Sequence, residues 1–279
     1  MVVDVVIVNW NCGPELVSAV RSALVFGGRP IVVDNASTLG SLAEISAMDG
    51  VTVVRHERNL GFAAGCNSGA AAGTGEIVLL LNPDAEIVSG TAGDLDRAFA
   101  SSGAMVLGPR LEHTSGRPLR SVHRVPRTTD LLHDLLRTRA LRRRLRPATA
   151  AEAAGQPTTA SPGWVVGSAL AIRRTDWDRL RGMDDGYFLW YEDLDLAARA
   201  TKAGGGVAMA PSILVRHVGA SSWVHLSHRR RQWLRVRGAF RYANRHLGWA
   251  GAAQIVLAAP IAIGIGVAQD AVHALRRLA

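Results

Sequence analysis

The chain has 279 residues, of which 48% are hydrophobic and 20% are charged. This length and composition are typical of a globular protein with a sizeable core, and they exclude a disordered chain. The formal net charge is +9 and comes almost wholly from arginine, because Lys202 is the only lysine. Cys12 and Cys66, the only cysteines, support neither a disulfide framework nor a zinc cluster, so we expect a protein of the reducing cytosol. No basic segment precedes the first apolar run, and we therefore expect no signal peptide.

Four apolar runs in the N-terminal part of the chain predict buried parallel strands. They cover residues 2–10, 30–37, 51–59 and 76–86. Helical patterns over residues 14–26 and 42–50 lie between them and indicate repeated β-α-β units. The fold class that follows is α/β, a Rossmann-like and mostly parallel sheet flanked by helices. Further along we expect helices over 94–103 and 175–183, strands over 105–110 and 164–174, and a polar loop over 148–163.

Polar side chains follow each of the four predicted strands where it ends. They are Asn9 and Asn11, then Asp34 and Asn35, then Asn59, and finally Asn82 and Asp84. Turn and cap preferences explain any one of these residues by itself. In open α/β sheets, however, the carboxyl ends of the strands form the ligand crevice. The succession of four polar ends therefore predicts one shared site.

Three common chemistries of parallel sheets lack their motifs in this sequence. No G-x-G-x-x-G follows the first strand, where the residues are VNWNCGPE, and neither a P-loop nor a G-x-S-x-G elbow is present. A nucleotide bound without a glycine-rich loop needs its diphosphate held in another way, usually by a divalent cation on one or two carboxylates. Asp84 in NPDAE is a candidate ligand, and alternation along an extended chain would place Asn82 and Glu86 on the same side.

The segment YFLWYEDLDL, residues 187–196, places Glu192, Asp193 and Asp195 directly behind an aromatic run. Acids at the start of a helix complement its free N–H groups and its macrodipole. The alternative is a catalytic carboxylate at the rim of an apolar pocket. Both interpretations stay open on these residues alone.

Arginine is concentrated in residues 137–147 and 228–246. Such clusters attract polyanions, which include nucleic acid, an anionic membrane surface and a diphosphate-bearing substrate. The weakly apolar tail over residues 250–268 is marginal for a spanning helix. It also fits docking on a membrane surface, or packing as a helix or oligomer contact, for example in a homodimer. The basic segment directly before it favours the membrane surface.

Seven motifs follow one another along the chain: VVIVNWN, VVDNAS, RNLGFAAGCNSG, LLLNPDAE, WVVGSALAIRR, GYFLWYEDLDLAARATKAG and HVGASS. Together they resemble the inverting GT-A glycosyltransferases of family 2, and within that family the bacterial rhamnosyltransferase-like branch. The resemblance spans roughly residues 3–225 and implies a GT-A glycosyltransferase domain over residues 1–225. Residues 226–279 then form a basic and apolar C-terminal helical extension that associates with the membrane.

The resemblance implies a donor nucleotide site in which Asp34 reads the nucleobase. Its other members are Asn9, Asn35, Asn59, Gly61, Asn67 and Asn82. Asp84 is implied to bind Mg²⁺ or Mn²⁺, because NPD stands where many relatives have a D-x-D metal motif. His217 matches a histidine that completes the metal shell in some relatives, and the alternative is a strand-end histidine bonded to backbone. Glu86 is a spare carboxylate for the same cation.

The resemblance also makes Asp193 the general base, which takes a proton from the acceptor hydroxyl. Glu192 and Asp195 are then supporting groups at a helix start. The implied pocket for the sugar and the acceptor contains Trp164, Tyr187, Phe188, Trp190 and Tyr191, with Glu192 beside them.

The expected function is transfer of a sugar, L-rhamnose from dTDP-L-rhamnose or another nucleotide-sugar, to a lipid-linked or polymeric glycan of the cell envelope. The protein is expected to be peripheral at the cytoplasmic face of the cell membrane. Two alternatives are weaker. A non-enzymatic nucleic-acid binder would use the arginine clusters, but no helix-turn-helix, RRM or zinc-finger pattern accompanies them, so we expect no nucleic-acid partner. A nucleotidyltransferase would carry a G-x-G-T-R-like loop with a lysine near its start, which is absent.

Overall fold

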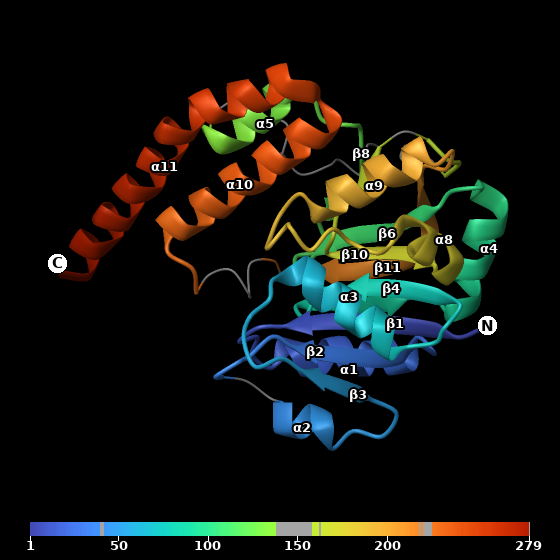
Figure 1. Cartoon of the computed structure of the whole chain (residues 1–279). Coiled ribbons are helices and arrows are strands. Elements are labelled where there is room, and N and C mark those ends of the chain that lie inside the picture. The colour runs from blue at the N-terminus through green and yellow to red at the C-terminus, as the bar shows by residue number, and fades with distance from the viewer. Residues whose placement is uncertain (40–41, 138–157, 162, 218, 220–224, 279) are drawn as a thin grey trace. The chain divides into compact units, whose positions relative to one another are not determined.

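The computed structural model describes residues 1–39, 42–137, 158–161, 163–217, 219 and 225–278 (Figure 1). The chain divides into two compact units. The first contains the described residues of Met1–Val125, Pro147–Gly186 and Asp193–Ser222, and the second those of Pro126–Arg146, Tyr187–Glu192 and Trp223–Ala279. The second unit thus takes in residues 126–137 and 187–192 in addition to the expected C-terminal extension. Most of the arginine-rich stretch 137–147 and of the expected loop 148–163 lies outside the described residues.

A large sheet forms the centre of the first unit, and its four N-terminal strands are parallel. These are β1 (Val3–Asn9), β2 (Arg29–Asp34), β3 (Thr52–Arg55) and β4 (Ile77–Leu81), which confirm four parallel strands at the predicted places. The expected burial of β3 is wrong, because it lies at the edge of the sheet, and the predicted strand 76–86 is broken by a turn after Leu81. β1 is parallel to both β2 and β4, and β2 is parallel to β3. Every residue of β1 and β4 is buried, because both faces of this part of the sheet are covered.

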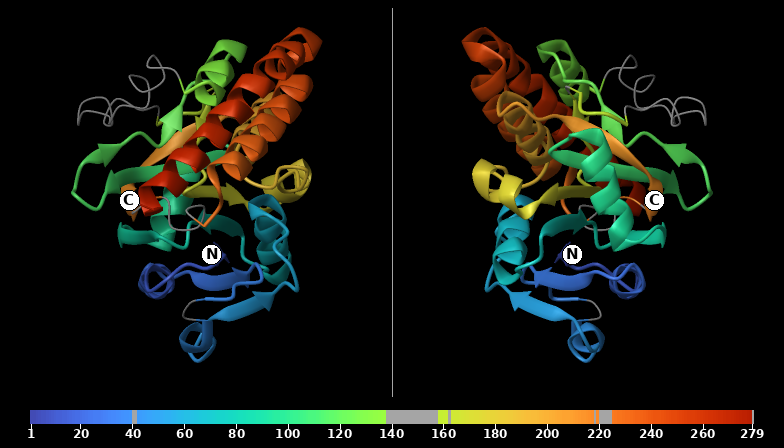
Figure 2. Two further views of the ribbon diagram at one scale, coloured as in Figure 1. Left: turned by 90° about the vertical axis from the view of Figure 1, so that its left-hand side faces the viewer. Right: turned by 90° about the vertical axis from the view of Figure 1, so that its right-hand side faces the viewer.

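Helices cover the two faces of this sheet (Figure 2). On one face, β1 residues such as Ile7 pack with α1 (Glu15–Val25) and α4 (Ala92–Ser102). On the other face, Val6 and Val8 pack with α3 (Phe62–Ala72), α8 (Arg174–Leu180) and α9 (Glu192–Lys202). A short helix, α2 (Leu42–Ser46), precedes β3. α1, α2, α4 and α8 confirm the predicted helices, with α2 shorter than expected.

α3 was not expected from the sequence, because Ala and Gly dominate it and weaken the apolar periodicity of a helix. Its small residues have a packing role. A Cβ atom at Gly65 would lie 2.7 Å from Cγ1 of Val8, so a side chain at this position would clash with β1. The glycine therefore lets α3 lie directly on the sheet.

The second half of the sheet adds both parallel and antiparallel pairings, because β11 is parallel to β6 and antiparallel to β5. The strand order is β3-β2-β1-β4-β10-β6-β11-β5, with β7 paired to β6. The added strands are β5 (Ala85–Ser89), β6 (Val106–His113), β7 (Pro118–Leu119), β10 (Ala169–Arg173) and β11 (Val207–His217). β10 is antiparallel to both β4 and β6, so the sheet is mixed. The predicted strand 164–174 is divided into β9 (Trp164–Val165), which pairs with β8 (Val122–His123), and β10, with residues 166–168 between them.

Three helices and the segment 187–192 make up the described part of the second unit (Figure 1). The helices are α5 (Thr128–Leu135), α10 (His228–His246) and α11 (Gly248–Leu278). Gln232 of α10 joins all three, because its Nε2 atom donates to the backbone oxygens of Leu135 at 3.0 Å and Ala262 at 3.1 Å. Asp270 of α11 accepts from the backbone N–H of His228 at 2.7 Å and so caps α10.

One helical span is long and apolar enough to cross a membrane, judged by length and composition within the described residues. It is Gly248–Leu275 of α11, whose most apolar window has a mean hydropathy of 1.9 and is 33% buried in the protein. Most residues of this window are therefore not buried within the protein.

Candidate active site

Asn9 and Asp34 end the neighbouring parallel strands β1 and β2, where they are paired in register. Both side chains are buried. Nδ2 of Asn9 donates to Oδ1 of Asp34 at 3.0 Å, and Oδ1 of Asn9 accepts from the backbone N–H of Cys12 at 3.2 Å. Two of the predicted donor-site residues thus form one polar pair at the carboxyl edge of the sheet.

Asn35 and Asn59 organise the loop that leads into α3. Oδ1 of Asn35 accepts from the backbone N–H of Leu60, and its Nδ2 donates to the backbone oxygen of Gly61, both at 3.0 Å. Asn59 accepts from the N–H of Gly61 at 2.9 Å, and Gly61 has a φ of 93°, which favours glycine. His56, which directly follows β3, adds a contact of 2.9 Å from its Nδ1 to Oδ1 of Asn35. The sequence did not single out His56, although it follows the end of a strand, as the predicted polar residues do.

Asn67 lies on α3 and holds a different part of the chain. Its side-chain amide donates to the backbone oxygen of Met183 at 2.8 Å and accepts from the N–H of the same residue at 2.9 Å. Both ends of the amide are therefore engaged in tying α3 to the segment that follows α8. The role of Asn67 in shaping the nucleotide pocket stays a prediction.

Asp84 and His217 face each other at the ends of neighbouring strands. Asp84 closes the turn between β4 and β5, and its side chain is buried. His217 ends β11 and is paired with Ala85 of β5. This pairing sets Nε2 of His217 3.2 Å from Oδ1 of Asp84 and 3.3 Å from the side-chain amide nitrogen of Asn82. The side chains of Asn82, Asp84 and His217 therefore converge.

Glu86 does not join this group. Residues 83–84 form a turn, so the expected alternation of Asn82, Asp84 and Glu86 along an extended chain is wrong. Glu86 is paired with Arg216 of β11, and their charged atoms approach to 4.0 Å. Neighbouring strand residues point to opposite faces, which directs Glu86 and Arg216 away from His217.

Asp193 is the second residue of α9, and two backbone N–H groups hold its half-buried carboxylate. Oδ2 accepts from Gly167 at 2.9 Å, and Oδ1 accepts from Leu194 at 2.8 Å. Burial raises the pKa of Asp193 to about 6, and these N–H donors oppose part of the rise. Such a carboxylate is a stronger proton acceptor than an ordinary aspartate and is still ionised at neutral pH.

The turn of residues 166–168 connects Asp193 with the turn that carries Asp84. Gly167 donates to Asp193, and the backbone oxygen of the next residue, Ser168, accepts from the N–H of Asn82 at 2.9 Å. A Cβ atom at Gly167 would lie 3.3 Å from Oδ2 of Asp193, so a side chain at this position would displace the carboxylate by a few tenths of an ångström. The motif WVVGSALAIRR contains Gly167, but only the pairing of β10 with β4 brings it to these partners.

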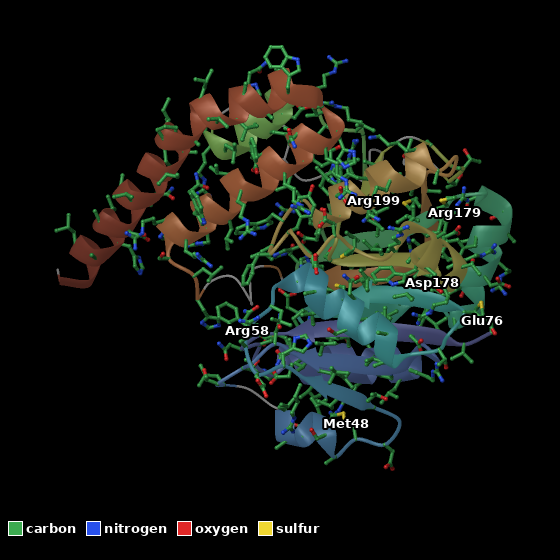
Figure 3. All side chains as sticks on the ribbon, in the orientation of Figure 1. Met48, Arg58, Glu76, Asp178, Arg179 and Arg199 are labelled. Carbon is green, nitrogen blue, oxygen red and sulfur yellow. The ribbon has the colours of Figure 1, made fainter. Side chains whose placement is uncertain are left out.

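Asp195 and Glu192 accompany the candidate base on α9. Asp195 is fully buried and accepts from Nε of Arg199 at 2.7 Å, one turn further along the helix. Figure 3 labels Arg199. Arg199 also donates to the backbone oxygen of Leu180 at 2.6 Å and so ties α9 to the end of α8. Asp195 therefore supports the fold. Glu192 is buried and begins α9.

Trp164, predicted for the acceptor pocket, lies on β9 and stacks on His123 of β8 with ring centroids 4.7 Å apart. Burial lowers the pKa of His123 to about 4, so the imidazole is neutral at physiological pH. His123 was not predicted, because a single histidine in so short a strand gives no sequence signal.

The aromatic segment before Asp193 belongs to the second unit. Tyr187 and Tyr191 are buried there, and the hydroxyl of Tyr191 donates to Oδ2 of Asp134 at 2.8 Å. The guanidinium carbon of Arg235 lies 4.7 Å from the ring centroid of Trp190. Neither Asp134 nor Arg235 was identified from the sequence.

The fold is that of a GT-A glycosyltransferase. GalNAc-T7 with UDP, GalNAc and Mn²⁺ matches with a TM-score of 0.56 at 18% identity, over 90% of this chain and 51% of the solved chain, so this chain spans about half its length. The mannosyltransferase PcManGT from Pyrobaculum calidifontis, in complex with GDP-Man and Mn²⁺, matches with a TM-score of 0.55 at 19% identity, over 98% of this chain and 75% of its own. At these identities the likeness shows the fold alone.

The sequence matches then define the family. Residues 4–155 match glycosyl transferase family 2, and residues 154–229 match the N-terminal domain of galactosyltransferase. The chain belongs to glycosyl transferase family 2 and is a glycosyltransferase. The N-acetylglucosaminyl-diphospho-decaprenol L-rhamnosyltransferase of Mycobacterium tuberculosis is 29% identical over 271 residues, which cover 89% of this chain and 86% of that protein. Rhamnosyltransferase WbbL of Escherichia coli K12 is 30% identical over 82 residues, 29% of this chain and 31% of that protein.

Proposed function

We propose that this glycosyltransferase transfers L-rhamnose from dTDP-L-rhamnose to a lipid-linked glycan acceptor, with inversion at the anomeric carbon. The mycobacterial relative supports the sugar and the acceptor, because its name specifies an L-rhamnosyl transfer to a glycan on diphospho-decaprenol. One structural observation carries the chemistry: Asn82 contacts His217 through its side chain and Ser168 through its backbone, and Gly167 beside Ser168 holds Asp193. These contacts link the candidate cation site to the candidate base, which supports a role for both in one reaction.

Asp193 is the general base in this proposal. Its carboxylate takes the proton of the acceptor hydroxyl, the acceptor oxygen forms a bond to C1 of the sugar, and the bond from C1 to the diphosphate oxygen breaks. The nucleoside diphosphate leaves from the opposite face, which inverts C1. The pKa of about 6 suits Asp193 to accept this proton at neutral pH. A second catalytic acid is unnecessary, because the leaving diphosphate needs its charge stabilised and not a proton.

Asp84, His217 and Asn82 would hold Mg²⁺ or Mn²⁺. A carboxylate, an imidazole nitrogen and an amide oxygen are suitable donors for a cation that completes its shell with substrate phosphates. The amide of Asn82 offers its oxygen after a flip, because the two ends of an amide have the same shape. Among the described residues, no group of three or more His, Cys, Asp or Glu side chains could hold a metal ion. The phosphates of the bound nucleotide-sugar would therefore supply the remaining ligands of the cation. The bound cation supplies positive charge that stabilises the leaving diphosphate.

Asp34 reads the nucleobase in this proposal. A carboxylate accepts hydrogen bonds only, and it therefore matches the N3–H donor of thymine or uracil. Asn9 donates to one of its oxygens and fixes the orientation of the group. The loop that Asn35 and Asn59 organise, with its backbone turn at Gly61, forms the neighbouring wall of the nucleotide site.

The second unit attaches the protein to the cytoplasmic face of the membrane in this proposal. Large exposed apolar side chains are concentrated on α10 and α11: Trp233, Phe240, Trp249, Val256, Leu257, Ile261, Val267, Val272 and Leu275. Exposed arginines stand beside them on α10: Arg229, Arg230, Arg237, Arg241 and Arg245. Apolar insertion and attraction to anionic lipid are the two signals that stable peripheral attachment needs.

A screen of nucleotide-sugars tests the proposed function. Thermal stability and sugar transfer to a lipid-linked acceptor are measured with Mn²⁺ or Mg²⁺, for the wild type and for Asp84→Ala. We expect dTDP-L-rhamnose to stabilise the wild type and to be consumed only with a divalent cation, and both effects to be lost in Asp84→Ala. Transfer from a different nucleotide-sugar would overturn the donor assignment, and transfer in the presence of a chelator would overturn the metal dependence.

A further inference from the structure

Trp190 and Tyr191 adopt a backbone conformation that bulky residues rarely take. Their φ angles are 70° and 74°, in the left-handed region that favours glycine. Two such residues in succession persist only where the surrounding structure holds them. The next residue, Glu192, begins α9, and Asp193 follows it. The strained pair is therefore separated from the proposed base by one residue, Glu192.

Asp134 of α5 and Arg235 of α10 hold the two aromatic side chains of this pair. Oδ2 of Asp134 accepts from the hydroxyl of Tyr191 at 2.8 Å, and Oδ1 of Asp134 lies 3.6 Å from Nη1 of Arg235. The guanidinium carbon of Arg235 lies 4.7 Å from the centroid of the Trp190 ring, within the range of a cation–π interaction. One carboxylate and one guanidinium thus fix both aromatic rings.

Gly238 brings α10 against the backbone of the same pair. A Cβ atom at this position would lie 2.7 Å from Cδ2 of Tyr191 and 3.0 Å from the backbone oxygen of Trp190. Both distances are shorter than ordinary van der Waals contact, and the backbone oxygen has little freedom to move away. Glycine is therefore required for the observed approach of α10 to the turn.

The same helix contacts the rest of the aromatic segment. The guanidinium of Arg241 lies 5.5 Å from the ring centroid of Tyr187, and that of Arg230 lies 6.0 Å from the ring centroid of Phe188. Together with Arg235, these arginines face three of the aromatic residues that precede α9. α10 is thus the main support of the segment within the second unit.

We propose that Asp134, Arg235 and Gly238 are positioning residues for the proposed base, Asp193, because they hold the strained Trp190–Tyr191 turn from which α9 begins. The second unit then contributes to catalysis and is more than a membrane anchor. Without these contacts the turn relaxes to an ordinary backbone conformation, and the first turn of α9, which carries Asp193, changes direction. This inference rests on the proposed function.

The substitution Gly238→Ala tests the inference, with Gly264→Ala of α11 as the matched control. A Cβ atom at Gly264 meets no atom within 4 Å, so this control adds the same methyl group without a contact. We expect Gly238→Ala to lower kcat at least tenfold while the KM for the donor stays within twofold of the wild type. A purely structural defect would reduce the amount of protein that binds the donor and leave kcat per binding site unchanged. Wild-type kcat in Gly238→Ala would overturn the inference.

Asp134→Ala and Asp134→Asn provide a second test that does not depend on the folding of Gly238→Ala. Asp134→Ala removes the acceptor of the Tyr191 hydroxyl, whereas Asp134→Asn keeps an oxygen in its place. We expect kcat to fall in the alanine variant and to be partly restored in the asparagine variant. Equal kcat in both variants and the wild type would overturn the inference while the proposed function stands. A wild-type protein that transfers sugar from no donor would instead overturn the proposed function.

Discussion

The backbone N–H of Gly167, in the turn of residues 166–168, donates to Oδ2 of Asp193 at 2.9 Å. Gly167 lies in the break between β9 and β10, and Asp193 lies in the first turn of α9. One of the two backbone N–H groups that hold the proposed base therefore comes from a distant part of the chain, and the other belongs to Leu194 of α9 itself.

Gly167→Ala is expected to impair transfer through Asp193. The added Cβ atom would lie 3.3 Å from Oδ2 of Asp193, so the carboxylate has to shift by a few tenths of an ångström and its hydrogen bond to the backbone of residue 167 is disturbed. A misplaced catalytic group costs roughly tenfold to a hundredfold in rate. We expect a loss of kcat of this size with donor binding retained, measured by steady-state kinetics. Gly93→Ala on α4, where a Cβ atom meets nothing closer than 3.6 Å, is the control and is expected to keep full activity.

The pH dependence of transfer is expected to follow the ionisation of Asp193. Its raised pKa of about 6 means that the base is ionised at pH 7 and becomes protonated as the pH falls through 6. Below that point kcat/KM is expected to fall about tenfold for each pH unit. Asp193→Asn is expected to lose roughly 10²–10⁴-fold in kcat and to have no such acidic limb. A wild-type profile that stays flat down to pH 4.5 would contradict this role.

His217→Ala and Glu86→Ala are expected to differ in their response to metal. His217 lies 3.2 Å from Asp84, whereas Glu86 is paired with Arg216 and points away. We expect His217→Ala to raise the Mn²⁺ concentration for half-maximal activity about tenfold or more, since lost ligands and supporting groups typically cost this much. Glu86→Ala serves as the control and is expected to titrate like the wild type. A Glu86→Ala variant with the larger defect would argue for a different cation site.

Membrane attachment is expected to depend on the exposed tryptophans of the second unit. Trp233 is 47% and Trp249 83% exposed, and burying the exposed part of such rings in the lipid interface contributes about 1–2 kcal/mol each, less for Trp233. The double substitution Trp233→Ala and Trp249→Ala is expected to abolish flotation with phosphatidylglycerol vesicles. Val25→Ala on α1, at a side chain that is 89% exposed, is expected to change nothing. Because arginines contribute, flotation of the wild type is expected to weaken at high salt and on neutral phosphatidylcholine vesicles.

Two arginines contact the buried carboxylate of Asp4, and substituting them is expected to lower the stability of the protein by unequal amounts. Arg29 and Arg174 donate to it at 2.6 Å and 2.9 Å, and the side chain of Arg29 is 48% exposed but that of Arg174 only 20%. Arg174 also donates to the backbone oxygens of Gly75 and Ala70. We expect Arg174→Ala to lower the free energy of unfolding by about 3 kcal/mol. Arg29→Ala is expected to cost about 1 kcal/mol, and denaturant titration distinguishes the two values.

The sequence by itself determined the first half of the sheet and the residue types of the site. β1 to β4 were predictable because continuous Val, Ile and Leu runs are a local signal of buried strands, although the edge strand β3 is only partly buried. The polar residues at their ends, among them Asn9, Asp34 and Asp84, were predictable because parallel strands share one carboxyl edge. Asp193 and His217 were identified through the ordered motifs that resemble family 2 glycosyltransferases.

Only the tertiary structure decided which of these residues contact one another. α3 was missed because its packing relies on small residues such as Gly65, which have no apolar periodicity. The place of Glu86 was decided by a turn and by its pairing with Arg216. Gly167 reaches Asp193, and Ser168 reaches Asn82, because β10 inserts antiparallel between β4 and β6. Asp134 reaches Tyr191 because α5 packs with α10 and α11 within the second unit. Strand order and helix packing join residues that are far apart in the chain, and the free energy of such contacts depends on the whole fold and leaves no local pattern in the sequence.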